Sequence, residues 1–109
     1  MEPIRILQWG LGAMGGGMAR LMLEKQGLKI VAAVDGRPDY VGKDLGEVLG
    51  VGKQLGVTVT NKPEAVLKKE NVDIVVIATT SWTKEQMPDL RKIISAGINC
   101  ISIAGAKAS

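Results

Sequence analysis

The sequence predicts an α/β fold, a doubly wound parallel sheet of the Rossmann-like type with about five strands. Nearly continuous apolar runs indicate strands that are buried on both faces, and helix-like or glycine-rich segments separate them. The first run leads into Gly-x-Gly-x-x-Gly, formed by Gly10, Gly12 and Gly15, and a second run ends at Asp35, about 20 positions further on. This combination is typical of a dinucleotide-binding turn.

The first strand is predicted at Ile4–Trp9 and the first helix at residues 13–26, with Gly27 placed to end it. Four apolar side chains share one face of this helix: Met14, Met18, Leu21 and Met22. Gly16 and Gly17 each cost the helix about 1 kcal/mol relative to alanine. We attribute these two glycines to close packing against a neighbouring strand, with a ligand near the first turn as the alternative.

The second strand is predicted at Leu28–Val34 and ends at Asp35. Residues 36–56 carry six glycines and show neither a clean helical nor a strand period. We therefore expect a long ordered loop with at most one short helical turn, at Leu45–Leu49. Loops of this length inside compact domains are usually functional or mobile. A short third strand is predicted at residues 57–60.

In the second half of the chain, Pro63 and Glu64 suit the first turn of a short helix that runs to about residue 69. The strongest strand of the sequence follows at residues 73–78. Pro88 interrupts any helix before residues 90–96, which are predicted as helical, and residues 98–103 form the fifth strand. Right-handed crossovers then place the first and fourth strands side by side.

In such sheets a ligand binds beyond the carboxyl ends of the strands, at the point where the strand order reverses. The glycine turn and the end of the fourth strand should therefore flank one crevice, in which the start of the first helix faces phosphate groups. The candidate cofactor-binding residues are Gly10, Leu11, Gly12, Ala13, Met14, Gly15, Asp35, Arg37, Ala78, Thr79 and Thr80. The alternative is a glycine-rich turn without a ligand.

Two residues bear on the choice of cofactor. The carboxylate of Asp35 would accept hydrogen bonds from the adenosine ribose and would repel a 2′-phosphate, which favours NAD. Arg37, two residues later, could instead pair with a 2′-phosphate, which favours NADP. We therefore predict that both NAD and NADP are used. For Asp35, the alternative to ribose binding is that it is an ordinary acidic residue at the end of a strand. For Thr79 and Thr80, the alternative to cofactor binding is a role in helix capping.

Composition excludes several other classes of protein. The net charge is +3 with a pI of about 9.2, but the basic residues are scattered among carboxylates and only 3% of residues are aromatic, which argues against nucleic-acid binding. No signal peptide or long apolar span is present, and Cys100 is the single cysteine, so a cytoplasmic location is expected. Without histidine, neither a His/Cys metal site nor a Ser-His-Asp triad can form.

Residues 7–15, 35–38 and 41–50, together with the Ala-Thr-Thr-Ser turn at 78–81, resemble the amino-terminal domain of the 2,4-diaminopentanoate dehydrogenases. Those enzymes belong to a wider group that is similar to dihydrodipicolinate reductase. The resemblance covers nearly the whole chain of 109 residues. It implies an NAD(P)-dependent oxidoreductase of amino-acid degradation, which oxidatively deaminates 2,4-diaminopentanoate to 2-amino-4-oxopentanoate and ammonia.

The resemblance also implies a second, longer domain for substrate binding, catalysis and homo-oligomer contacts. We therefore expect residues 1–109 to be a truncated nucleotide-binding domain, to which no catalytic residue is assigned, with a small amino-acid substrate reached through the missing domain. Two alternatives remain open. One is a reductase of the dihydrodipicolinate reductase type, and the other is a non-enzymatic domain that senses a nucleotide and regulates a partner.

Overall fold

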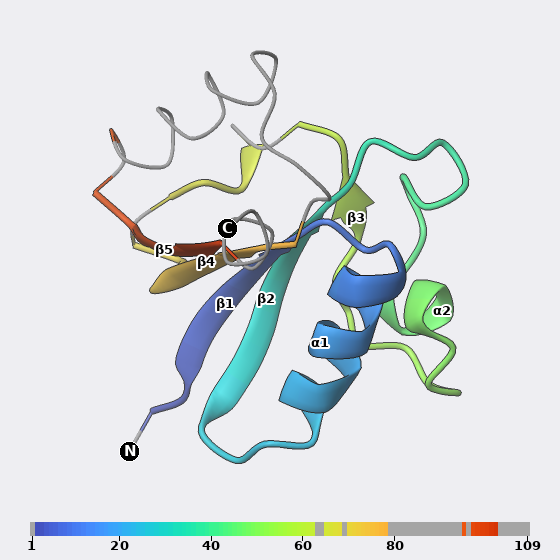
Figure 1. The fold of residues 1–109 in the computed structure, drawn as a ribbon, viewed down its shortest axis with the longest axis horizontal. Helices are drawn as coiled ribbons and strands as arrows, with labels where there is room; N and C mark the ends of the chain where they lie inside the picture. The colour runs from blue at the N-terminus through green and yellow to red at the C-terminus, as the bar shows by residue number, and fades with distance from the viewer. Residues whose placement is uncertain (1, 63–64, 69, 79–94, 96, 103–109) are drawn as a thin grey trace, which may run out of the picture.

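The computed structural model describes residues 2–62, 65–68, 70–78, 95 and 97–102, and it confirms the Rossmann-like α/β fold (Figure 1). The strands of the described part are β1 (Ile4–Trp9), β2 (Leu28–Val34), β3 (Val59–Thr60), β4 (Ile74–Ile77) and β5 (Asn99–Ser102). They form one parallel sheet in the order β3-β2-β1-β4-β5. The described helices are α1 (Ala13–Leu23) and α2 (Leu45–Leu49). As predicted, β1 and β4 lie side by side, and the other neighbour of β1 is β2.

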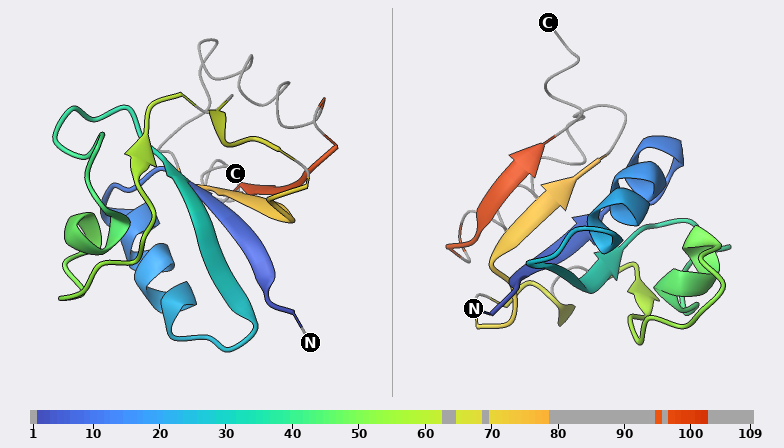
Figure 2. Two further views of the ribbon diagram at one scale, coloured as in Figure 1. Left: turned by 180° about the vertical axis from the view of Figure 1, so that it is seen from behind. Right: turned by 90° about the horizontal axis from the view of Figure 1, so that it is seen from below.

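Both faces of the sheet are covered, which explains the continuous apolar runs of its strands. On one face, Ile6 of β1 packs with Ala19 of α1 and Leu45 of α2 in one cluster of buried side chains. On the other face, Leu7 packs with Val72 and Val75, and the segment before β4 closes over them. Figure 2 shows α1 and α2 together on the first of these faces.

The register brings the carboxyl ends of the three central strands into line. Trp9, the last residue of β1, pairs with Val34 of β2 and with Ile77 of β4. The loops that follow β1, β2 and β4 therefore start from one edge of the sheet. At the opposite end of the strands, Arg5 forms an ion pair with Asp73 at 3.0 Å, and this guanidinium lowers the pKa of the Asp73 carboxyl to about 2.

Two elements are shorter than predicted. Helix α1 ends at Leu23 rather than at residue 26, because its last turn tightens: the N–H groups of Glu24 and Lys25 donate to carbonyls only three residues back. The third strand covers only Val59–Thr60. Its predicted start at Val57 pairs instead with the preceding loop, since the carbonyl of Val57 accepts from the N–H of Leu45.

Other predictions differ or lie outside the described residues. The helix expected from Pro63 to about residue 69 is replaced, over its described part at 65–68, by short turns in which hydrogen bonds span only two or three residues. The fourth and fifth strands agree with the prediction to within a residue at each described end. The predicted helix at 90–96 lies outside the described residues apart from residue 95.

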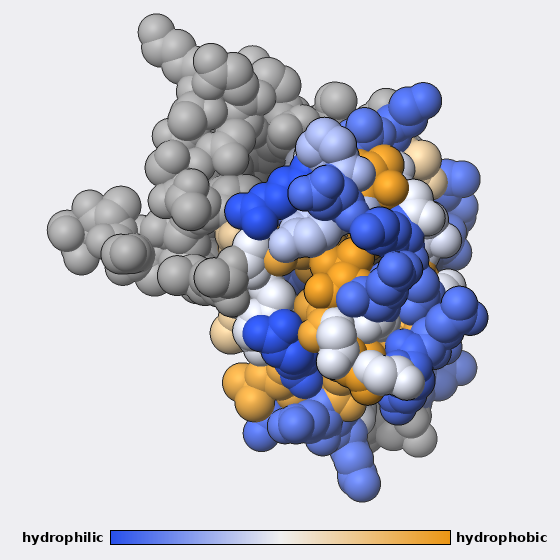
Figure 3. All heavy atoms as spheres, turned by 90° about the vertical axis from the view of Figure 1, so that its right-hand side faces the viewer, coloured by the Kyte–Doolittle hydropathy of each residue, from blue (hydrophilic) through white to orange (hydrophobic). Residues whose placement is uncertain are grey.

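The long loop of residues 36–56 is ordered, as predicted, and contains the one short helix expected at Leu45–Leu49. Asp44 organises it: the two carboxylate oxygens accept backbone N–H groups at 2.8 to 3.2 Å from Gly46, Leu55, Gly56 and Val57. These hydrogen bonds lower the pKa of the Asp44 carboxyl, with that from Leu55 contributing most. Figure 3 shows this side of the molecule, where apolar surface lies between hydrophilic side chains.

We predict that Asp44→Asn lowers the melting temperature at pH 7. A carboxylate whose pKa is depressed by folding stabilises the protein above its ordinary value of 3.8, and this stabilisation is lost as the pH falls through the folded pKa. The difference between variant and wild type should therefore shrink below about pH 4. Thermal melts from pH 7 to pH 3 measure it, with the exposed Asp39→Asn as control. A constant difference at every pH would contradict the assignment.

Candidate functional site

The turn between β1 and α1 is fixed to the neighbouring strands. Gly10 has φ of 100°, a left-handed conformation that glycine adopts without strain, and its N–H donates to the carbonyl of Val34 at 2.8 Å. On the other side, the N–H of Ala78, directly after β4, donates to the carbonyl of Trp9 at 2.8 Å. The structure thus confirms that the glycine turn and the end of the fourth strand are adjacent.

Gly15 allows α1 to approach this turn. A Cβ atom at Gly15 would overlap with the carbonyl oxygen of Gly10 and would lie 3.2 Å from the Cβ of Ala78. The close-packing interpretation of the next two glycines is wrong for Gly17, where a Cβ would meet no described atom within 4 Å. At Gly16 the nearest atom, the carbonyl oxygen of Leu11, is at an ordinary 3.4 Å.

Helix α1 starts without a side-chain cap. Gly12 occupies the N-cap position and makes no side-chain cap hydrogen bond, and the first turn carries no acidic residue. The N–H groups of the first turn of a helix lack partners within the helix and favour an anion. Because Gly12 has no side chain, a pyrophosphate can approach the backbone of this turn closely.

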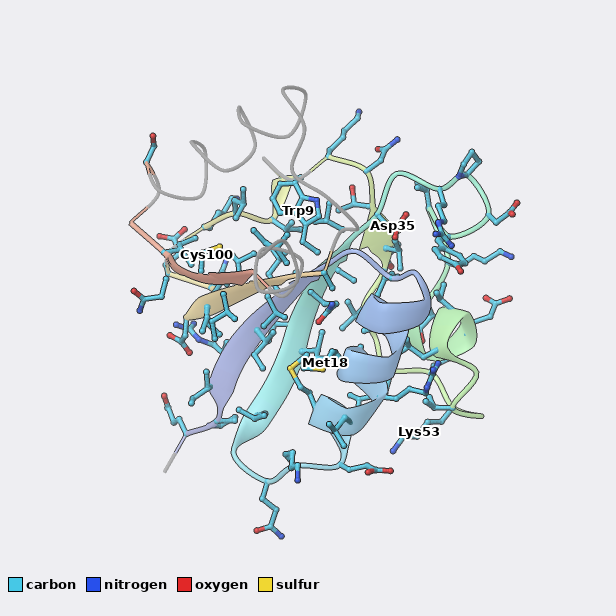
Figure 4. All side chains as sticks on the ribbon, viewed as in Figure 1. Trp9, Met18, Asp35, Lys53 and Cys100 are labelled. Carbon is cyan, nitrogen blue, oxygen red and sulfur yellow. The ribbon has the colours of Figure 1, made fainter. Side chains whose placement is uncertain are left out.

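Asp35 follows β2 and is 9% exposed. Oδ2 accepts the N–H of Leu11 at 2.7 Å, and Oδ1 accepts the N–H of Arg37 at 2.8 Å. Figure 4 shows Asp35 at the end of the sheet where α1 begins. The carboxylate therefore fastens the glycine turn to the loop after β2, and each of its oxygens keeps a further lone pair for a ribose hydroxyl.

Arg37 lies over the glycine turn. Its Nη2 atom is 3.1 Å from the position that a Cβ would take at Gly12. Its Nη1 donates to the hydroxyl of Tyr40 at 3.4 Å, and Cζ lies 5.5 Å from the centre of the Tyr40 ring. An exposed guanidinium at the mouth of the turn, beside the carboxylate of Asp35, can pair with a phosphate group.

Most of the predicted site residues lie together. The sequence places Gly10, Leu11, Gly12, Ala13, Met14, Gly15, Asp35, Arg37 and Ala78 around the start of α1, and the structure brings their backbones to one edge of the sheet. Thr79 and Thr80 lie outside the described residues. Two residues that touch the site were not predicted, Tyr40 and Gln8. The signal for Gln8 was its place as a polar residue between the apolar Leu7 and Trp9 at the end of a predicted buried strand.

Other kinds of site receive no support from the described residues. They contain no cluster of three or more His, Cys, Asp or Glu side chains that could hold a metal ion. Cys100 is half-buried and burial raises the pKa of its thiol, as expected for a packing residue. Among the helices that the structure describes, none has the length and apolarity needed to cross a membrane.

Comparison with known proteins identifies the family. The family model for the N-terminus of dihydrodipicolinate reductase matches residues 4–76, which include β1, α1, β2, β3 and most of β4. The chain belongs to the dihydrodipicolinate reductase N-terminal family. Within this family it is 36% identical, over 106 residues, to the 2,4-diaminopentanoate dehydrogenase of Acetoanaerobium sticklandii. The alignment covers 95% of this chain and 30% of that protein, which confirms the resemblance found in the sequence.

Two solved structures extend the comparison. The amine dehydrogenase of Mycobacterium smegmatis superposes with a TM-score of 0.84 at 39% identity, over 93% of this chain and 30% of that one. GenD2 from gentamicin A biosynthesis, solved in complex with NAD, superposes with a TM-score of 0.72 at 26% identity, over 94% and 27% of the two chains. The chain thus spans less than a third of these relatives.

Proposed function

We propose that this chain is the NAD(P)-binding domain of an oxidoreductase that oxidatively deaminates a 2,4-diamino acid, with 2,4-diaminopentanoate as the substrate. The observation that carries the cofactor assignment is the uncapped start of α1, with the buried carboxylate of Asp35 held beside it by a hydrogen bond from the N–H of Leu11. The substrate assignment is supported by the 36% identity to a 2,4-diaminopentanoate dehydrogenase across 95% of the chain.

Each group of site residues has a distinct role in this proposal. The backbone of Gly10, Leu11, Gly12, Ala13, Met14 and Gly15 receives the pyrophosphate. Asp35 accepts hydrogen bonds from the adenosine ribose, Arg37 donates hydrogen bonds to the 2′-phosphate of NADP, and Ala78, Thr79 and Thr80 border the nicotinamide half. When bound, the cofactor accepts the hydride that the substrate carbon loses on oxidation.

The work of these residues is binding and orientation. No catalytic residue is assigned to this chain, and the proposal places substrate recognition, proton transfer and homo-oligomer contacts in a second domain. The much greater length of the relatives supports that division. A reductase of the dihydrodipicolinate type is the second candidate, because the matching family model is named after that enzyme.

The test is calorimetric titration of the purified protein with NAD, NADP and adenosine diphosphate-ribose. We expect all three to bind, since each carries the pyrophosphate and the ribose. Absence of binding for all three would contradict the cofactor assignment. The substrate assignment is tested on the complete gene product by following reduction of NAD and NADP with 2,4-diaminopentanoate. If only the oxidation of NADPH by dihydrodipicolinate is catalysed, the second candidate is correct.

We predict that Arg37→Ala weakens NADP binding by roughly tenfold to a hundredfold, the value of a charge-assisted hydrogen-bonded pair. NAD has no 2′-phosphate, so its affinity should change by no more than about twofold. The matched control is Lys43→Ala, which removes another exposed cation from the same loop. Titration of both cofactors into both variants measures the ratio. An equal loss for NAD and NADP would refute the phosphate role of Arg37.

A further inference from the structure

Gln8 is a fully buried polar side chain in β1, two residues before the glycine turn. Its Nε2 atom donates to the carbonyl of Gly10 at 3.0 Å. Its Oε1 atom is also buried and has no hydrogen-bond partner among the described residues. An unpartnered buried oxygen lowers stability, and an apolar side chain of similar size would avoid that cost. Fold stability alone therefore does not account for a glutamine here.

The hydrogen bond from Gln8 completes a clamp on one peptide group. The carbonyl of the Gly10–Leu11 peptide accepts from Gln8, and the N–H of the same peptide donates to Oδ2 of Asp35 at 2.7 Å. Gln8 and Asp35 are the buried polar or charged residues of the described part of the chain, and both bind this peptide. Glycine itself would leave the peptide free to rotate, since it accepts many backbone conformations.

The first turn of α1 also packs directly against the carbonyl of Gly10. A Cβ at Gly15 would overlap with this oxygen, so the height of the helix start above the sheet depends on where the Gly10 carbonyl points. Gln8 reaches that carbonyl from the side of β1, which is itself fixed between β2 and β4. The orientation of the turn is thereby tied to the rigid centre of the sheet.

We propose that Gln8 is a positioning residue for dinucleotide binding. It holds the Gly10 carbonyl and, together with Asp35, fixes the Gly10–Leu11 peptide so that the following N–H groups are presented to a pyrophosphate. This inference rests on the proposed function of the turn. It adds to the glycine pattern a residue that the pattern does not contain, and it gives a reason for a buried glutamine with an unpartnered oxygen.

The test replaces Gln8 with methionine, which is similar in length and lacks the N–H donor. We expect the melting temperature of Gln8→Met to stay close to that of the wild type, because the loss of the unpartnered oxygen offsets the loss of the hydrogen bond to the Gly10 carbonyl. The Kd for both NAD and NADP should rise by about five- to tenfold, the value of one hydrogen bond. In addition, the Leu11 amide should exchange with solvent faster, while the amides of β1 keep their protection.

The control is Ile6→Val, a change at a buried position on the same face of the same strand. This variant should melt at a lower temperature and bind both cofactors within about twofold of the wild type. Should Gln8→Met fail to fold, Gln8→Leu gives the same measurement.

The outcomes separate the two proposals. If the wild type binds NAD and NADP and the Gln8 variant binds them with the same affinity, the positioning role alone is overturned. A weaker affinity accompanied by a lower melting temperature and faster exchange throughout β1 shows a purely structural role and also overturns it. Absence of NAD and NADP binding in the wild type overturns both this inference and the proposed function.

Discussion

Replacing Gly15 with alanine is expected to remove measurable NAD(P) binding and to lower the free energy of unfolding by about 3 kcal/mol, as in severe overpacking. The added Cβ would overlap with the backbone carbonyl of Gly10, and the Cβ of Ala78 stands 3.2 Å away on the other side. Backbone cannot move aside as a flexible side chain can. Either α1 shifts away from the sheet or the turn changes shape, and both disturb the proposed phosphate site.

The matched control lies two residues further along the same helix. Gly17→Ala adds the same methyl group where no described atom lies within 4 Å. It should stabilise the protein by about 0.5–1 kcal/mol, since alanine restricts the unfolded chain and favours the helix. Urea unfolding and calorimetric titration of the two variants provide the comparison. Equal stability of Gly15→Ala and wild type would show that α1 does not approach the turn as closely as the structure indicates.

The parts of the fold that were predictable are those with a local cause. Strands β1, β2 and β4 stand out because burial on both faces requires continuous apolar runs. The short helix at Leu45–Leu49 follows from a capping aspartate, and Gly50 ends it in a left-handed conformation. The third strand was overestimated because Val57 pairs with Leu45, a contact between distant parts of the chain that no local pattern encodes.

The site shows the same division. The glycine spacing locates the turn, and the spacing to Asp35 identifies the acidic residue, because both follow from the length of one strand-helix-strand unit. The sequence does not reveal that the Asp35 carboxylate binds the N–H of Leu11, or that Arg37 lies over Gly12. Those contacts depend on how far the loop after β2 folds back over the turn.

Asp35 is the residue whose removal should affect both stability and cofactor choice. Asp35→Ala leaves the N–H groups of Leu11 and Arg37 without their acceptor, and the first of these is buried. We expect a loss of about 2–4 kcal/mol in the free energy of unfolding, since a buried N–H group that loses its charged acceptor stays without a hydrogen bond. Affinity for NAD should fall by more than about a hundredfold, because the proposed ribose contact and the clamp on the turn are lost together.

Asp35→Asn separates these two effects because it keeps the shape and one acceptor oxygen while it removes the charge. It should lose less stability than Asp35→Ala, and its affinity for NAD should fall by about tenfold. Its affinity for NADP should fall less, since a neutral amide no longer repels a 2′-phosphate that Arg37 attracts. The ratio of NADP to NAD affinity therefore rises in Asp35→Asn and falls in Arg37→Ala.

Opposite movement of this ratio in the two variants is what distinguishes a specificity pair from two residues that merely support the loop. Asp39→Asn, an exposed carboxylate four residues later, controls for the change in net charge and should leave the ratio unaltered. Titration of each variant with both cofactors, beside urea unfolding, gives affinity and stability from the same preparations. A ratio that stays constant in Asp35→Asn would assign its carboxylate to the clamp on Leu11 alone and would remove it from cofactor selection.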